Sequence, residues 1–216
     1  MLSVNYFSDV LCVWAWIAQR RVEELSAQFG DSITIVHRYM DIFGAVDQKM
    51  DNQWGQRGGY DGFAAHVSDA VDGFDHAPVH PETWRSNRPQ TSGNAHLIIR
   101  AVGLAEGEAV ATAFARNVRG AFFEHAVNIA DWNALLRLLD DDQLSRQRVL
   151  GHIEDGSAMA ALLSDYQAAR NLNLKGSPSY VMNDERQILY GNVGYRVLSA
   201  NVEELLKQVN HEASWC

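Results

Sequence analysis

The chain has 216 residues, and 47% of them are hydrophobic, which suffices for one large domain or for one domain with a large insertion. The formal net charge of −9 at pH 7 argues against nucleic acid and anionic membranes as partners, because both bind basic surfaces. No basic segment followed by an apolar one opens the chain, and no apolar run approaches the roughly 18 residues of a membrane-spanning helix. We therefore expect a cytoplasmic protein.

The first 43 residues predict a β-α-β unit. Residues 2–7 alternate between apolar and polar side chains and predict a strand. Residues 13–29 have a helical pattern that ends at Gly30, because glycine is favoured just after a helix. Residues 33–39 are rich in β-branched side chains and predict a second strand. A helix between two strands is typical of a parallel pair.

Residues 44–172 predict an insertion made only of helices. Its first part, residues 44–62, contains five glycines among polar residues and predicts a mobile loop. Phe114, Phe122 and Phe123 recur at helical spacing and predict part of the core of the insertion. We expect helices at residues 63–71, 91–102, 106–124, 131–139, 144–154 and 157–171.

Strands return only near the end of the chain. Residues 179–183 and 187–190 flank a short polar turn and predict a β-hairpin, and residues 197–209 predict a final helix. The order of elements predicts an α/β fold with a four-stranded mixed sheet. We expect a discontinuous domain formed by residues 1–43 and 173–216, interrupted by the helical insertion.

Cys12 lies where the first strand passes into the first helix. Unpaired backbone N–H groups and the positive end of the helix dipole favour a thiolate there, so the position suits a nucleophile. The alternative is that Cys12 is a small buried hydrophobe. The other cysteine, Cys216, lies at the opposite end of the chain, and the two form neither a disulfide framework nor a C-x-x-C pair.

The sequence predicts no metal site. His76 and His80 have a spacing that could place two ligands on one face of a helix, but Pro78 and Pro81 break the helix that this spacing requires. The cysteines offer no zinc-binding pair either.

The arrangement resembles the thioredoxin plan, in which a cysteine begins the first helix and a proline precedes the third strand. Here the proline is Pro178, in the segment Lys175-Gly176-Ser177-Pro178-Ser179-Tyr180-Val181. The resemblance implies that Pro178 is cis and faces Cys12, and that the backbone of Ser177 pairs with a substrate chain. Without the resemblance, Pro178 is an ordinary proline at the start of a strand.

The helical insertion makes the chain similar to the DsbA-like branch, which includes FrnE-type dithiol oxidoreductases, 2-hydroxychromene-2-carboxylate isomerases and kappa-class glutathione transferases. Asp9-Val10-Leu11-Cys12-Val13-Trp14-Ala15-Trp16 is similar to the FrnE pattern D-x-x-C-P-W-C-[YF] and to the isomerase and kappa pattern D-x-x-S-P-Y-[SA]-W. Ala15 stands in the place of the second cysteine, and Val13 replaces the proline. A C-x-x-C mechanism is therefore excluded, because Ala15 cannot release a mixed disulfide.

Three routes remain for Cys12. It could act as a monothiol with glutathione as the external thiol, or it could hold or activate glutathione in place of the serine of the isomerase and kappa enzymes. Cys216 could instead resolve a disulfide of Cys12, against the simpler interpretation of Cys216 as an incidental exposed thiol.

Other residues could shape the site. Trp14 and Trp16 flank the nucleophile on different helix faces, so we expect one to cover the thiol and the other to pack in the core. Asp9 either raises the pKa of the thiol or serves as a cap or turn residue. In glutathione-binding relatives a Ser-Asp pair holds the γ-glutamyl carboxylate; the matching pair here is Asn192-Val193, which could also form an ordinary turn.

We therefore predict a thioredoxin-like, DsbA-like enzyme without a bound cofactor: a thiol-disulfide oxidoreductase that uses Cys12 and glutathione as co-substrate. One alternative is a glutathione-dependent isomerase or transferase, in which the loop at residues 44–62 encloses a small apolar substrate. Another is a non-catalytic binding or chaperone-like module. The expected partners are a thiol or disulfide substrate or a small apolar molecule, and a second copy of the chain in a homodimer.

Overall fold

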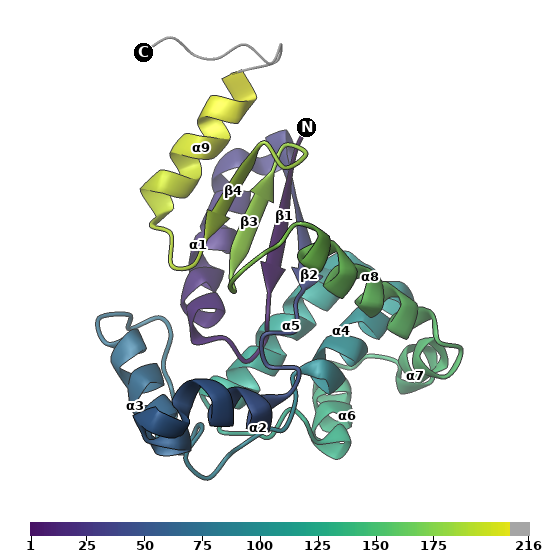
Figure 1. Cartoon of the computed structure of the whole chain (residues 1–216). Helices are drawn as coiled ribbons and strands as arrows, with labels where there is room; N and C mark the ends of the chain where they lie inside the picture. The colour runs from purple at the N-terminus through teal and green to yellow at the C-terminus, as the bar shows by residue number, and fades with distance from the viewer. Residues whose placement is uncertain (208–216) are drawn as a thin grey trace.

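Four strands form one mixed sheet in the computed structural model, which describes residues 1–207 (Figure 1). The strand order is β2-β1-β3-β4, with β1 and β2 parallel and the other neighbouring pairs antiparallel. The strands are β1 (Leu2–Ser8), β2 (Ile33–Tyr39), β3 (Ser179–Met182) and β4 (Gln187–Tyr190). The predicted mixed sheet, its parallel pair and its hairpin are confirmed.

Two helices belong to the sheet-forming parts of the chain, α1 (Val13–Phe29) and α9 (Tyr195–Lys207). The helices between β2 and β3 are α2 (Val46–Lys49), α3 (Gly59–Val71), α4 (Gly93–Glu106), α5 (Glu108–Phe123), α6 (Trp132–Asp141), α7 (Arg146–Glu154) and α8 (Ser157–Asn171). A π-helical turn at Met50–Trp54 and 3₁₀ turns at Gly30–Ser32 and Gly55–Arg57 complete the set.

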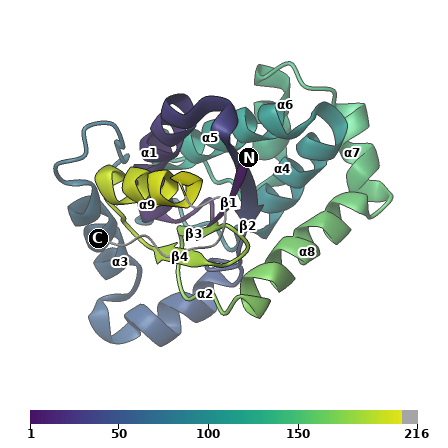
Figure 2. The same ribbon diagram turned by 90° about the horizontal axis from the view of Figure 1, so that it is seen from above.

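Both faces of the sheet are covered by helices (Figure 2). Successive side chains of a strand point to opposite faces. Val4 of β1 therefore joins an apolar cluster with Leu25 of α1 and Val202 of α9. Phe7 of the same strand joins a second cluster with Ala169 of α8 on the other face. This burial on two sides fixes the direction in which β1 ends, and hence where the following residues lie.

The largest apolar cluster joins the start of α1 to the helical insertion. Trp16 stacks on Phe123 with their ring centroids 5.7 Å apart. Phe114, Phe122 and Phe123 are buried, which confirms their predicted place in the core. The division into residues 1–43 with 173–216 and residues 44–172 stays a prediction, and this cluster runs across its boundary.

The glycine-rich segment at residues 44–62 is helical over most of its length, so the prediction of a mobile loop is wrong. Val46, Met50 and Trp54 recur every four residues and are all buried, which outweighs the low helix propensity of the glycines between them. Gly58 and Gly59 have positive φ angles of 89° and 57° and mark the bend at which α3 begins.

The remaining helices lie within a few residues of their predicted ranges. The helix predicted to stop at Gly103 continues to Glu106, and Gly107, with a φ of 96°, follows it. The final helix was predicted over residues 197–209 but begins at Tyr195, and residues 208–209 lie outside the described part of the chain.

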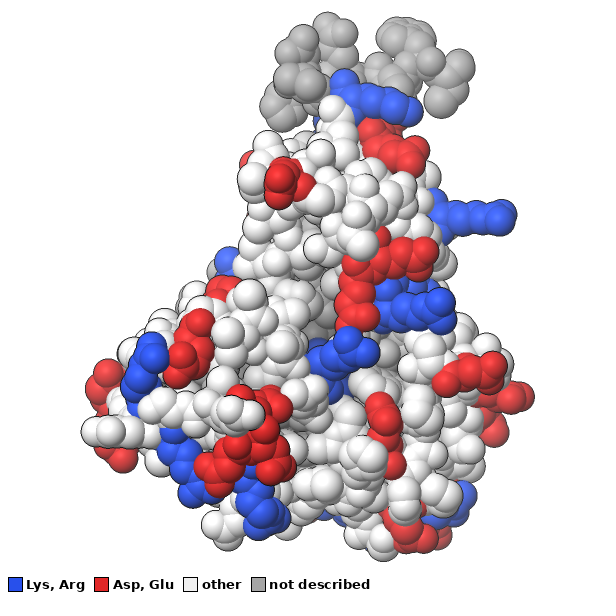
Figure 3. Space-filling model, turned by 180° about the vertical axis from the view of Figure 1, so that it is seen from behind, with Lys and Arg blue, Asp and Glu red and all other residues white. Residues whose placement is uncertain are grey.

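No helix within residues 1–207 is long and apolar enough to cross a membrane. The back of the molecule carries acidic and basic side chains close together (Figure 3).

We expect Gly62→Ala to destabilise the fold by about 1–3 kcal/mol, because an added Cβ would lie 1.9 Å from the carbonyl oxygen of Arg57. Gly55→Ala is the matched control: Gly55 has helical φ and ψ angles of −50° and −48°, and nothing lies within 4 Å of its added Cβ. This control should leave the unfolding free energy unchanged or raise it by about 0.5–1 kcal/mol. Urea unfolding measures both, and equal effects would contradict the packing at Gly62.

Candidate active site

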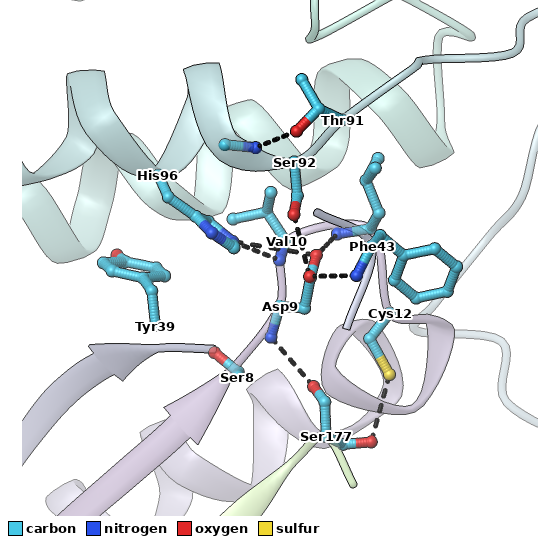
Figure 4. Close-up of polar contacts among 12 residues, drawn as sticks. Ser8, Asp9, Val10, Cys12, Tyr39, Phe43, Thr91, Ser92, His96 and Ser177 are labelled. Atoms are coloured by element: carbon cyan, nitrogen blue, oxygen red, sulfur yellow. Dashed lines mark hydrogen bonds and ion pairs between the residues drawn. The ribbon is translucent and has the colours of Figure 1, made fainter. Parts of the chain in front are cut away.

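Cys12 is the residue directly before α1 and is only 6% exposed. Its Sγ atom lies 3.1 Å from the carbonyl oxygen of Ser177, to which the thiol can donate a hydrogen bond (Figure 4). The peptide bond between Ser177 and Pro178 is cis, as the resemblance implied. Residues 165 positions apart in the chain are thus brought into contact at the carboxyl end of β1.

Burial raises the pKa of the Cys12 thiol, and the negative charge of Asp9 adds to this effect. The Ser177 hydroxyl and the backbone N–H groups of Ala15 and Trp14 act in the opposite direction, but desolvation outweighs them. The position at a helix start was predicted to favour the thiolate. In this structure the protonated thiol is favoured, because the sulfur is removed from water and a carbonyl oxygen accepts a hydrogen bond from the S–H group.

Asp9 is fully buried and connects three parts of the chain. Its carboxylate accepts hydrogen bonds from the backbone N–H groups of Leu11, at 2.9 Å, and Phe43, at 2.8 Å, and from the Ser92 hydroxyl, at 2.9 Å. The bond to Leu11, two residues on, makes Asp9 a turn residue, which was one of the two interpretations. Burial raises the pKa of Asp9 to about 6 in spite of these donors.

Sequence reasoning missed His96 of α4, which completes this buried group. Its Nε2 atom accepts the Val10 N–H at 3.2 Å, so the ring proton is on Nδ1, 2.8 Å from the Tyr166 hydroxyl. Burial lowers the pKa of His96 well below its usual range, and the charge of Arg119 adds to this. The His96 Nε2 atom, 3.7 Å from Asp9, is therefore a neutral contact. Its one sequence signal was a histidine within the apolar run of residues 95–102.

One of the two tryptophans packs in the core, as predicted. Trp16 is buried and donates from Nε1 to the Pro78 carbonyl at 3.1 Å. Trp14 is partly exposed, with its ring edge-to-face to His66 at a centroid distance of 6.5 Å. A role for Trp14 in covering the thiol stays a prediction. Ala15 is fully buried, so the position of a second thiol is filled by a methyl group.

Lys49 of α2 was also missed, because its segment was expected to be a loop. Its Nζ atom donates to Gln53 at 2.9 Å and lies 4.9 Å from the centre of the Phe43 ring. Burial lowers the pKa of Lys49, while the charges of Asp9 and Cys12 act to raise it. Its ammonium group is therefore within electrostatic reach of Cys12.

The other predicted site residues lie apart from this cluster or outside the described chain. Asn192 is exposed, and its amide oxygen accepts a hydrogen bond from Arg21 in the middle of α1. Val193 packs against the apolar cluster beneath α9. Cys216 lies outside the described residues. Binding roles for Asn192 and Val193 stay predictions.

A metal site has no support in residues 1–207, which contain no group of three His, Cys, Asp or Glu side chains that could hold an ion. His76, considered above with His80, instead has its Nε2 atom 3.1 Å from the Ile17 carbonyl oxygen. This contact ties the loop before α4 to α1.

A profile of the family described as DSBA-like thioredoxin domain matches residues 3–203. A protein of Nitrosomonas europaea, described as a candidate protein disulfide isomerase, has a similar structure, with a TM-score of 0.79, 15% identity and coverage of 97% of this chain and 99% of that one. The cytosolic disulfide reductase DsbM of Pseudomonas aeruginosa is similar with a TM-score of 0.70, 16% identity and coverage of 96% and 100%. DsbM has also been solved with GSH.

A 2-hydroxychromene-2-carboxylate isomerase is similar with a TM-score of 0.64, 17% identity and coverage of 98% of this chain and 100% of that one. At these identities the likeness to solved structures shows the fold alone. A comparison with curated protein sequences found no significant match.

We expect the difference in stability between the wild type and Asp9→Asn to depend on pH. The folded-state pKa of Asp9, about 6, lies above its ordinary value of 3.8, so the folded state binds more protons between these values. Relative to Asp9→Asn, the wild type should therefore lose about 2–3 kcal/mol of unfolding free energy as the pH rises through this window.

Urea unfolding of both proteins at pH values across the window measures this difference. Ser92→Ala is the control, since it removes a hydrogen bond that lowers the pKa of Asp9 and should widen the window. A difference that stays constant with pH would contradict a buried, charged Asp9.

Proposed function

The chain belongs to the DSBA-like thioredoxin domain family, and from this premise we propose that it is a thiol-disulfide oxidoreductase that uses Cys12 alone, with glutathione as the external thiol. The observation that supports this most is the contact of Cys12 Sγ with the Ser177 carbonyl, 3.1 Å away, beside the cis bond of Pro178. In this contact the Cys12 sulfur lies next to a backbone carbonyl that could pair with a substrate chain. Buried Ala15 leaves no second thiol at the helix start.

The proposed exchange has two steps. The Cys12 thiol first loses its proton, and the thiolate attacks a substrate disulfide; a bond forms between Cys12 and one substrate sulfur while the other sulfur leaves as a thiolate. A glutathione thiolate then attacks the mixed disulfide, takes over the substrate sulfur and returns Cys12 to its reduced form. The substrate gains two electrons in all when a second glutathione releases it from the glutathione adduct.

Substrate binding itself could free the thiol. The Ser177 carbonyl accepts a hydrogen bond from the Cys12 thiol, and the same carbonyl would accept a hydrogen bond from a backbone N–H of a bound chain. A substrate strand that takes this carbonyl competes with the thiol for it. The backbone N–H groups of Trp14 and Ala15, which lower the pKa of Cys12, would then stabilise the thiolate as it forms.

Two cations could hold the carboxylates of glutathione. Lys49 is within electrostatic reach of Cys12, and Arg21 lies beside Asn192 at the loop before α9. In this proposal Trp14 forms one wall of the site, while Asn192 and Val193 contact the γ-glutamyl end.

We expect the reaction to take place in the cytoplasm. That location and the formation of a homodimer stay predictions.

A second candidate function has one specific observation in its favour, the burial of Cys12, whose side chain is only 6% exposed. Burial raises the pKa of this thiol, so it can donate a hydrogen bond to the sulfur of a bound glutathione instead of attacking a disulfide. The protein would then be a glutathione-dependent isomerase or transferase. Trp54 belongs to the segment at residues 44–62 that would enclose a small apolar substrate, and its ring lies 4.9 Å from that of Phe63.

Cys12→Ser and Cys12→Ala separate these functions. In an exchange mechanism both variants lose glutathione-dependent reduction of hydroxyethyl disulfide, because neither side chain forms a disulfide. In a glutathione-activating mechanism Cys12→Ser retains saturable glutathione binding by calorimetry, while Cys12→Ala weakens it, because only the hydroxyl can donate. A wild type that neither binds glutathione nor reduces the disulfide would contradict both and favour a non-catalytic module.

We expect the rate of Cys12 alkylation by iodoacetamide to keep rising with pH beyond the point at which that of free glutathione levels off. The reason is that burial raises the pKa of Cys12 and only the thiolate reacts. Peptide mass spectrometry assigns the reaction to Cys12 rather than Cys216. Asp9→Asn should move the profile to lower pH, because it removes a charge that raises this pKa. A wild-type plateau below that of glutathione would contradict the prediction.

A further inference from the structure

A groove lies between α1 and α5, beside strands β1 and β2 (Figure 3). Its volume is about 910 Å³, in the range of small-molecule sites in proteins. Val22 and Ala27 of α1, Ile35 of β2 and Ala113 of α5 give it an apolar lining. Cys12, Ser177 and Pro178 do not line it, so this groove is separate from the thiol site.

Arg119 of α5 lies in the lining of this groove and is only 4% exposed. Its Nη2 atom donates to the Ser8 hydroxyl at 2.8 Å, whereas its Nε atom has no hydrogen-bond partner. Among residues 1–207 no carboxylate forms an ion pair with it. The charge of Asp9 acts on Arg119 without an ion-pair contact. A buried guanidinium without a contacting carboxylate is costly, and a bound anion would reduce that cost.

Two further buried polar atoms lie in the same lining. The Gln19 side-chain oxygen forms no hydrogen bond within the described chain, and the Tyr6 hydroxyl, which lies near the Ser8 side chain, forms none of good geometry there. Burial raises the pKa of Tyr6, so its hydroxyl stays protonated and can donate. Buried polar atoms in folded proteins are nearly always paired, so the Arg119 Nε, the Gln19 oxygen and the poorly paired Tyr6 hydroxyl in one groove together indicate a ligand.

The other charged side chains of the lining are paired, and its histidine is neutral. Glu23 of α1 and Arg116 of α5 pair with each other at 3.3 Å, and Glu108 pairs with Arg100 at 3.5 Å. Burial, followed by the charge of Arg119, lowers the pKa of His37 to about 4, so this ring is neutral at pH 7. Arg119 is therefore the positive charge in the lining that no lining carboxylate pairs with; the charge that acts on it is that of Asp9, which does not line the groove.

We propose that this groove binds a small organic acid with one carboxylate and an apolar body. The carboxylate would accept hydrogen bonds from Arg119 and Tyr6, which are both donors, and the apolar body would lie along Val22, Ile35 and Ala113. A hydroxyl or amide N–H on the ligand would satisfy Gln19. This site is independent of the thiol chemistry proposed for Cys12.

Calorimetric titration with 3-phenylpropionate tests the site, with 3-phenylpropanamide as the neutral control of the same shape. The wild type should bind the acid saturably and the amide at least about tenfold more weakly. Arg119→Met keeps the bulk of the side chain without its charge and should weaken acid binding by at least about tenfold, whereas Arg146→Gln on α7, which does not line the groove, should change it little.

Ala113→Trp covers the case in which Arg119→Met does not fold. Ala113 is exposed, so the larger ring can fill the groove without disturbing the core, and binding should be lost. Cys12→Ala should bind the acid as the wild type does, which separates this site from the thiol site. Equal binding of acid and amide, acid binding retained in both Arg119→Met and Ala113→Trp, or no saturable binding to the wild type would overturn the proposal.

Discussion

The buried carboxylate of Asp9 is the interaction on which the arrangement of the thiol site depends. Its bonds to Leu11, Phe43 and Ser92 fasten the turn before α1 to the start of the insertion and to the start of α4. The Asp9 N–H in turn bonds the Ser177 hydroxyl at 2.9 Å, beside the cis peptide. One residue thus holds together four segments that are far apart in the chain, and Cys12 is placed by that attachment.

The same burial that makes this attachment strong works against a reactive sulfur. A low dielectric strengthens the bonds to Asp9 but favours the uncharged form of Cys12, and the charge of Asp9 adds to that preference. Cys12 therefore rests as a thiol bonded to Ser177. In the exchange mechanism proposed above, a substrate chain that displaces this bond would free the thiol.

The helical insertion supplies buried groups to both sites. His96 of α4 fixes the Val10 N–H beside the thiol site, and Arg119 of α5 bonds Ser8, the last residue of β1. Ser8 precedes Asp9 directly, so the residue that holds Arg119 of the groove and the residue that supports the thiol site are neighbours at one strand end. The insertion thereby shapes the carboxyl end of β1 from two directions.

The sequence by itself determined the elements whose patterns are local. The alternation of β1, the helical period of α1 and the turn between β3 and β4 depend on neighbouring residues, and resemblance to a known plan added the cis bond at Pro178 and the disulfide-exchange family. Tertiary structure decided the rest. The helical turns at residues 44–62, the pairing of His96 and the unpaired charge of Arg119 depend on contacts between distant residues. The preference of Cys12 for its protonated form was decided there too, because desolvation depends on every atom that surrounds the sulfur, whereas the helix start that favours the thiolate is visible in the sequence.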